Sequence, residues 1–150
     1  MGQDGRVHAD EVAIRGLINA YCDRLDAGDF DGVAALFARG AFRSPAGTNL
    51  EGADAVRRMY DPVIRYADNT PRTKHVLGTV LIEVDGQAGT AAARSHFTVF
   101  QAVPDIPLQP VLAGRYHDTF TRADGAWWFT ERMVRPDLEG DLSRHMGNRG

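Results

Sequence analysis

Two residues that are far apart in the chain, Asp26 and His75, have the types and settings that general acid–base catalysis uses. His75 follows Arg72, Thr73 and Lys74 and begins a run of alternating residues typical of a β-strand. Because an imidazole changes charge near neutral pH, His75 in a pocket would act as a general base or acid. At an exposed strand start it would simply be solvated or hydrogen-bonded, and both interpretations remain open.

Asp26 stands at the C-terminal end of a predicted helix, one turn after Cys22 and beside the buried stripe of that helix. A carboxylate there adds to the negative end of the helix dipole, which costs about 0.5 kcal/mol. Asp26 is either a solvated residue at the turn through Ala27 and Gly28, or it faces a pocket and accepts a proton from His75. In the second case it would fix the imidazole tautomer and stabilise the charged form.

Further polar candidates lie on faces whose direction the sequence leaves undecided. Tyr21 shares the apolar helix face, where packing is the default, although a buried phenol hydroxyl normally finds a partner and could reach a substrate oxygen. Arg94 and His96 share one face of a later strand. His96 is a second acid–base candidate if that face lines the pocket, and ordinary surface if it meets water. Tyr116 on the next strand has the same ambiguity.

The composition of the chain favours a single folded domain and argues against several classes of partner and site. The 150 residues are 43% hydrophobic and 25% charged, which suits one folded domain with a single core. The formal charge of −3 argues against a nucleic-acid partner. The lone Cys22 cannot form an intrachain disulfide, and no Cys or His spacing suggests a metal site, so a reducing cytoplasm fits best. Without about 18 consecutive apolar residues, we expect no membrane span.

Hydrophobic spacing places helices in the first half of the chain and strands in the second. Predicted helices cover 10–28, 29–40 and 53–66, a brief strand covers 41–44, and long strands cover 74–84, 90–102, 111–122 and 126–134. This order predicts an α+β fold, with a curved antiparallel sheet wrapped on three N-terminal helices around one apolar pocket. We expect a flexible N-terminus over 1–8, a domain over 9–136, and a tail over 137–150 that is disordered or wraps a neighbouring subunit.

Several segments, taken in order, resemble the SnoaL-like branch of the nuclear transport factor 2-like superfamily over about residues 9–136. The segments are the helix through Tyr21 and Asp26, Gly28-Asp29-Phe30-Asp31, Thr73-Lys74-His75-Val76-Leu77-Gly78, Val84-Asp85-Gly86, and the hairpin from Gly114-Arg115-Tyr116-His117-Asp118 to Asp124-Gly125-Ala126-Trp127. The resemblance implies a cone-shaped α+β barrel with one deep apolar pocket, and a homodimer or homotrimer.

The resemblance also implies roles for particular residues. In lyases of this family, such as scytalone dehydratase and bile acid 7α-dehydratase, an Asp near the end of the first helix and a His at the start of the first long strand form a dyad. Asp26 and His75 match those positions, and Tyr21 matches a catalytic tyrosine of the bile acid dehydratase. Phe42 and Tyr116 fall near pocket positions of scytalone dehydratase.

The leading hypothesis is a cofactor-free lyase or isomerase, most directly a dehydratase, acting on a small hydrophobic cyclic substrate. His75 would remove a proton, Asp26 would hold and stabilise His75, and Tyr21 or His96 would donate to the departing oxygen. The alternatives are a non-catalytic ligand-binding protein or oxygenase small subunit, and a polyketide cyclase or epoxide hydrolase. The residues expected to contact substrate are Phe42, Arg94, His96 and Tyr116.

Overall fold

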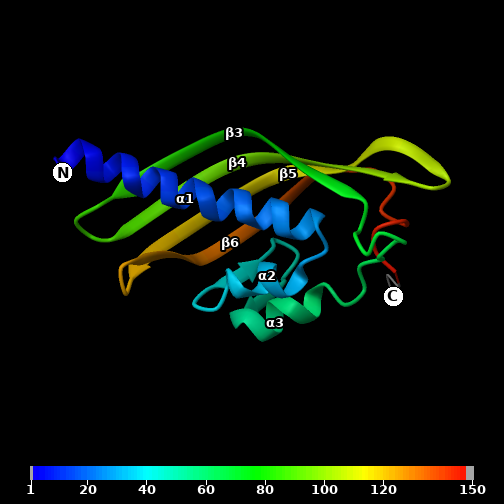
Figure 1. Cartoon of the computed structure of the whole chain (residues 1–150), viewed down its shortest axis with the longest axis horizontal. Coiled ribbons are helices and arrows are strands. Elements are labelled where there is room, and N and C mark those ends of the chain that lie inside the picture. Colours follow the sequence, from blue (N-terminus) through cyan, green and yellow to red (C-terminus); the bar gives the residue numbers. More distant parts are fainter. Residues whose placement is uncertain (1, 148–150) are drawn as a thin grey trace.

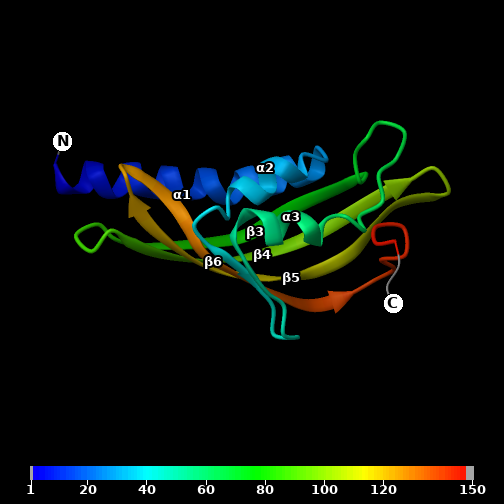
Figure 2. The ribbon, with the colours of Figure 1, turned by 90° about the horizontal axis from the view of Figure 1, so that it is seen from below.

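The structure is a computed structural model that describes residues 2–147. Its helices lie on one side of a curved, unclosed six-stranded sheet with strand order β2-β1-β6-β5-β4-β3 (Figures 1 and 2). The elements are α1 (Gln3–Asp26), α2 (Phe30–Ala35), β1 (Ala41–Arg43), β2 (Asn49–Glu51), α3 (Gly52–Met59), β3 (Thr73–Asp85), β4 (Thr90–Val103), β5 (Ile106–Ala123) and β6 (Ala126–Glu139). The α+β order predicted from the sequence is confirmed.

Helix α1 carries the apolar stripe that the spacing predicted and lies across the sheet (Figure 1). It begins at Gln3, inside the segment for which we expected flexibility, because adding residues to an existing helix costs little and Asp4 complements the dipole in the first turn. Its buried residues are Ile14, Ile18, Tyr21, Cys22 and Leu25. The helix ends at Asp26, which is therefore held at the edge of the core.

The two shorter helices are bounded by different local features, a capping residue at the start of α2 and a proline after the end of α3. Asp29 caps the start of α2 by accepting a hydrogen bond from the Gly32 amide at 2.9 Å. Helix α3 ends at Met59, well before the predicted end at residue 66, because Pro62 has no amide hydrogen and cannot continue a helix. Strand β2, which the sequence did not predict, has only three residues and so carries no periodic signal.

A β-bulge in β3 decides which residues of that strand face the helices. The pairing with β4 shifts register between Leu77 and Val80, so β3 contains one extra residue there. Before the bulge His75 and Leu77 face inward, and after it Val80, Ile82 and Val84 face inward as well. Strict alternation would have put these two groups on opposite faces, which is why the sequence left the direction of His75 undecided.

Strand β5 begins earlier than predicted, and strand β6 ends later than predicted. Strand β5 begins at Ile106 rather than 111, and Pro110 is accommodated because the register with β4 shifts between Val99 and Phe100. Beyond β6 the chain folds back on itself, burying Leu142 and pairing Met146 with Val63. The described part of the tail thus covers its own domain, and residues 148–150 lie outside the described residues.

The space between α1 and the sheet is filled with aromatic rings. Phe129 stacks on Phe37 with centroids 5.1 Å apart, and Phe97 stacks on Tyr116 at 4.2 Å. This packing occupies much of the volume in which the sequence predicted an apolar pocket. None of the described helices combines the length and hydropathy that crossing a bilayer requires.

Candidate active site

Asp26 and His75 meet where α1 ends and β3 begins. The Nδ1 atom of His75 lies 2.6 Å from Oδ1 of Asp26, and the His75 amide donates to Oδ2 at 2.8 Å. Thr73 adds a third hydrogen bond, from its hydroxyl to Oδ1 at 2.9 Å. The side chains are largely buried, with exposed fractions of 6% for His75 and 16% for Asp26. The structure therefore brings together the two residues that the sequence singled out.

The surroundings of Asp26 explain how a carboxylate is tolerated at the negative end of a helix. Its hydrogen bonds all come from the first residues of β3, and they supply donors that the helix end itself lacks. Because β3 is the edge strand of the sheet, its start is free to reach the end of α1. The backbone contact through His75 ties the position of the imidazole to that of the carboxylate.

The hydrogen bond to Asp26 sets the tautomer of His75. If Asp26 is ionised, it only accepts hydrogen bonds, and a neutral imidazole then carries its proton on Nδ1 and its lone pair on Nε2. A hollow of about 280 Å³ borders the imidazole and is lined by Asn19, Cys22, Asp23, His75 and Leu77. It lies where α1 meets the sheet edge, so a small molecule placed there would contact His75.

Three tyrosines extend this site toward the core. The Tyr21 and Tyr60 hydroxyls are 3.1 Å apart, and the Tyr21 ring meets those of His75 and Tyr116 edge-on, with centroids 6.5 and 5.8 Å apart. Burial raises the pKa values of Tyr21, Tyr60 and Tyr116 above the ordinary phenol value. Their hydroxyls therefore stay protonated at neutral pH and can donate hydrogen bonds.

Beneath the tyrosines lies an ion pair that the sequence analysis missed. Arg132 donates to both carboxylate oxygens of Asp118, at 2.8 and 2.9 Å, and both side chains are fully buried. The guanidinium lies over the rings of Tyr116 and Tyr21, 3.8 and 4.3 Å from their centroids. Burial opposes the charge of Arg132, but Asp118 outweighs it and raises the pKa of Arg132, so the cation is permanent.

One guanidinium nitrogen of Arg132 makes no hydrogen bond to the described part of the chain. Within residues 2–147, Nη1 of Arg132 and the hydroxyl of Ser95 are buried without a hydrogen-bond partner. The sequence signal for Arg132 was only the presence of an arginine inside the predicted strand over 126–134. Its direction was hidden because the pairing of β5 with β6 shifts register between Thr119 and Phe120, which changes the face on which Arg132 lies.

The predicted substrate-binding residues divide between the two faces of the sheet. Tyr116 and Phe42 are buried, and Phe42 packs edge-on against Phe37 with centroids 6.0 Å apart. Arg94 and His96 lie on the exposed outer face, so the expectation that they line the pocket is corrected. The reason is strand alternation, because Ser95 and Phe97 take the inward positions.

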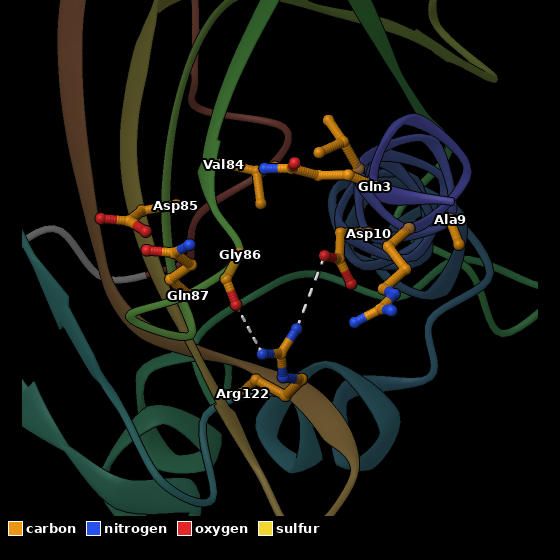
Figure 3. A pocket seen from close by; sticks show the side chains of 10 residues that line it. Gln3, Ala9, Asp10, Val84, Asp85, Gly86, Gln87 and Arg122 are labelled. Carbon is orange, nitrogen blue, oxygen red and sulfur yellow. Dashed lines mark hydrogen bonds and ion pairs between the residues drawn. The ribbon is translucent and has the colours of Figure 1, made fainter. Parts of the chain in front are cut away.

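A larger hollow, of about 980 Å³, lies near the other end of α1, between its first turns and the β3–β4 turn (Figure 3). Arg122 reaches across it to the Gly86 carbonyl at 2.8 Å and toward Asp10 at 3.5 Å. Asp10 also accepts from the Trp127 indole at 2.9 Å. This hollow is about 24 Å along the helix from Asp26, so it is separate from the imidazole.

Comparison with known proteins agrees with this architecture. A helix-backed, curved and open sheet of this topology is the nuclear transport factor 2-like fold, seen also in a solved structure described as having a cystatin-like fold. The family model for the SnoaL-like domain matches residues 6–133. The chain therefore belongs to the SnoaL-like domain family, and the resemblance noted from the sequence is confirmed.

Individual solved structures share the fold. Rv3472(D26N), a protein of unknown function from Mycobacterium tuberculosis, is 28% identical, with a TM-score of 0.76 over 91% of this chain and 77% of that chain. A candidate scytalone dehydratase from Novosphingobium aromaticivorans is 22% identical, with a TM-score of 0.75 over 99% and 98%.

The β subunit of a candidate aromatic-ring-hydroxylating dioxygenase, also from Novosphingobium aromaticivorans, is 18% identical, with a TM-score of 0.73 over 95% and 99%. A search of curated proteins finds no match. At 22% and 18% identity, the last two structures establish the fold alone.

Proposed function

We propose that this protein is a cofactor-free lyase or isomerase, most directly a dehydratase, in which Asp26 and His75 form a general-base dyad. The observation that carries the proposal is the 2.6 Å contact between His75 Nδ1 and Asp26 Oδ1 beside a hollow. That contact leaves Nε2 as the basic atom and gives the imidazolium formed after proton removal a carboxylate partner.

The proposed reaction begins with removal of a proton from a carbon atom next to a carbonyl group. His75 Nε2 takes the proton, and Asp26 stabilises the resulting positive charge. The electron pair left on carbon forms the new double bond as the bond to a β-hydroxyl breaks. A proton from the Tyr21 phenol, or from the imidazolium, then completes the departing water.

The charge and size of the surroundings support a small substrate that gains negative charge during the reaction. The Arg132 cation lies over the Tyr21 ring, where it favours an enolate-like species near that tyrosine. The hollow beside His75, at about 280 Å³, is just below the usual size range of small-molecule sites. We therefore expect a cyclic substrate with a single small ring system.

The test uses a panel of cyclic β-hydroxyketones, with water loss followed by the ultraviolet absorbance of the conjugated product. We expect His75→Ala and Asp26→Asn each to lower kcat/KM by about 10²–10⁴-fold. The matched control is His96→Ala, because His96 is exposed on the opposite face and its loss should leave the rate unchanged. Equal rates for the His75→Ala variant and the wild-type protein would refute the dyad.

A second candidate is a non-catalytic ligand-binding protein or an oxygenase small subunit. The observation in favour of the subunit role is the interior itself, which is filled with stacked rings and a buried ion pair. A subunit predicts neither binding nor turnover of the panel compounds by the wild-type protein, whereas a ligand-binding protein predicts binding, by calorimetry, without turnover. A polyketide cyclase or another proton-transfer enzyme would instead exchange substrate hydrogen for deuterium without losing water.

A further inference from the structure

The outer face of the sheet, opposite the helices, carries a compact group of cationic and titratable side chains. We define the basic patch as Arg94 and His96 of β4, Arg115 and His117 of β5, and Arg135 of β6. Strand pairing sets Arg94 beside His117, His96 beside Arg115, and Arg115 beside Arg135. The patch therefore spans three adjacent strands on the side that the helices leave open (Figure 2).

The basic patch contains more positive than negative charge. Its carboxylate partner is Asp137, which accepts two hydrogen bonds from Arg115, both at 2.9 Å. Within residues 2–147, Arg94 and Arg135 form no ion pair, and Nε of Arg135 is buried without a hydrogen-bond partner. Burial, followed by the charges of Arg135, Arg115 and Arg94, lowers the pKa of His117, as expected where cations crowd together.

Such crowding is unusual in a chain with a formal charge of −3. Like charges on neighbouring strands repel, and a surface without a binding role would spread them among acidic residues. Beside the patch, on β3, Val76 and Leu81 expose 46% and 52% of their surface, although they are hydrophobic. A protein segment bound to the basic patch would also cover these apolar side chains, and removing them from water favours binding.

We propose that the basic patch docks an extended, carboxylate-rich segment of a partner protein. In β geometry, side chains two residues apart on one face are separated by about 6.8 Å. Arg94 and His96 have this relation on β4, as do Arg115 and His117 on β5. Alternate acidic residues of an extended segment repeat at the same spacing, so successive carboxylates would meet the Arg and His side chains in turn, the arginines as cations and the histidines as hydrogen-bond donors.

Two other occupants fit the charges less well. A second copy stacked on this face about a two-fold axis through the patch would place cations against cations, because the same patch would form both sides. A nucleic acid requires a broad positive field, and the overall charge of −3 opposes it. The charges of the patch therefore favour an acidic protein segment over both.

The experiment measures fluorescence anisotropy of a labelled eight-residue peptide of alternating Glu and Ser, at low ionic strength. The patch variant is Arg94→Gln with Arg135→Gln. The matched control is Arg15→Gln with Arg58→Gln, which removes the same charge from exposed positions on α1 and α3. We expect the patch variant to weaken binding by about tenfold or more, and the control to change it by less than about twofold.

A single variant and two further binding and sedimentation measurements distinguish this proposal from its alternatives. Arg94→Gln alone, at an exposed position, should give part of the loss even if the double variant folds poorly. Absence of peptide binding to the wild-type protein, or equal loss in patch and control variants, would overturn the proposal. So would tighter binding of a single-stranded oligonucleotide of equal charge, or self-association in sedimentation that only the patch variant abolishes.

Discussion

Two aspartates of this protein each hold a basic side chain through short hydrogen bonds, but they do so in different surroundings. Asp26 contacts His75 at the sheet edge, beside a hollow, and the two side chains keep exposed fractions of 16% and 6%. Asp118 contacts Arg132 in the middle of the sheet, where neither side chain is exposed. In the proposed function the first pair exchanges a proton with a bound molecule, whereas the second holds a fixed charge.

The difference follows from the base and from the strand that carries it. An imidazole loses and regains a proton near neutral pH, but a guanidinium does not. Strand β3 is an edge strand, so the start of the strand is accessible, whereas β5 and β6 pair with neighbours on both sides. In the proposed function, the fold therefore separates a proton-transfer position from an electrostatic position, and the Tyr21 ring lies against both His75 and Arg132.

The largest expected effect comes from breaking the deeper pair. Asp118→Asn leaves the Arg132 charge buried without a countercharge, and we expect it to lower the free energy of unfolding by about 3–5 kcal/mol. Asp26→Asn removes hydrogen bonds to a base that can be neutral, so we expect a loss of about 1–2 kcal/mol. Urea unfolding of both variants provides the measurement.

A double variant separates charge from packing in this comparison. Asp118→Leu combined with Arg132→Met replaces the ion pair by apolar side chains and should recover much of the stability lost in Asp118→Asn. If Asp118→Asn alone does not fold, a cooperative unfolding transition in the double variant would itself show the recovery. A loss in Asp118→Asn no greater than that in Asp26→Asn would contradict the contrast between the two pairs.

The two pairs also differ in how far the sequence could predict them. Asp26 ends a strongly periodic helix and His75 begins a strand, so both positions follow from element boundaries. Arg132 and Asp118 lie inside strands, where direction depends on counting residues. The register shift after Thr119 changes the inward positions of β6, and such a bulge has no clear sequence signature.

The same physical limit explains the other differences between prediction and structure. The bulge after Leu77 brings both halves of β3 to one face, which alternation alone could not reveal. Tyr60 meets Tyr21 across 39 residues of sequence, and no local pattern encodes that contact. The order of elements was predictable because helix and strand periodicities are local, whereas the packing of the interior was not.

A smaller effect on stability is expected at high pH, where the buried thiol and phenol groups keep their protons in the folded chain. Burial raises the pKa of the Cys22 thiol from 9.0 to about 11 and raises the pKa values of Tyr21, Tyr60 and Tyr116. In the unfolded chain these groups lose protons at their ordinary pKa values, whereas in the folded chain they retain them. Stability is therefore full below pH 9 and falls as the pH rises toward 11.

The Cys22→Ala variant provides the control for this prediction of pH-dependent stability. A pKa of about 11 in the folded chain, against 9.0 in the unfolded chain, corresponds to about 3 kcal/mol of stability lost between pH 9 and 11. Urea unfolding across that range should give a shallower slope for Cys22→Ala than for the wild-type protein. The slope is compared, not the absolute stability, because the substitution also leaves a cavity. Identical slopes would show that Cys22 is not protected as the structure indicates.

The smallest expected effect on stability is at a third Asp-containing pair, on the solvent-exposed face. Arg115 and Asp137 form two hydrogen bonds, both at 2.9 Å, much like Arg132 and Asp118, but their side chains are 42% and 41% exposed. Water and salt replace such a contact readily, so Asp137→Asn should leave the urea midpoint nearly unchanged. The same substitution frees Arg115 and removes the carboxylate of the basic patch, so it should tighten binding of the acidic peptide. A stability loss comparable to that of Asp118→Asn would mean that geometry, rather than burial, sets the contribution of these pairs.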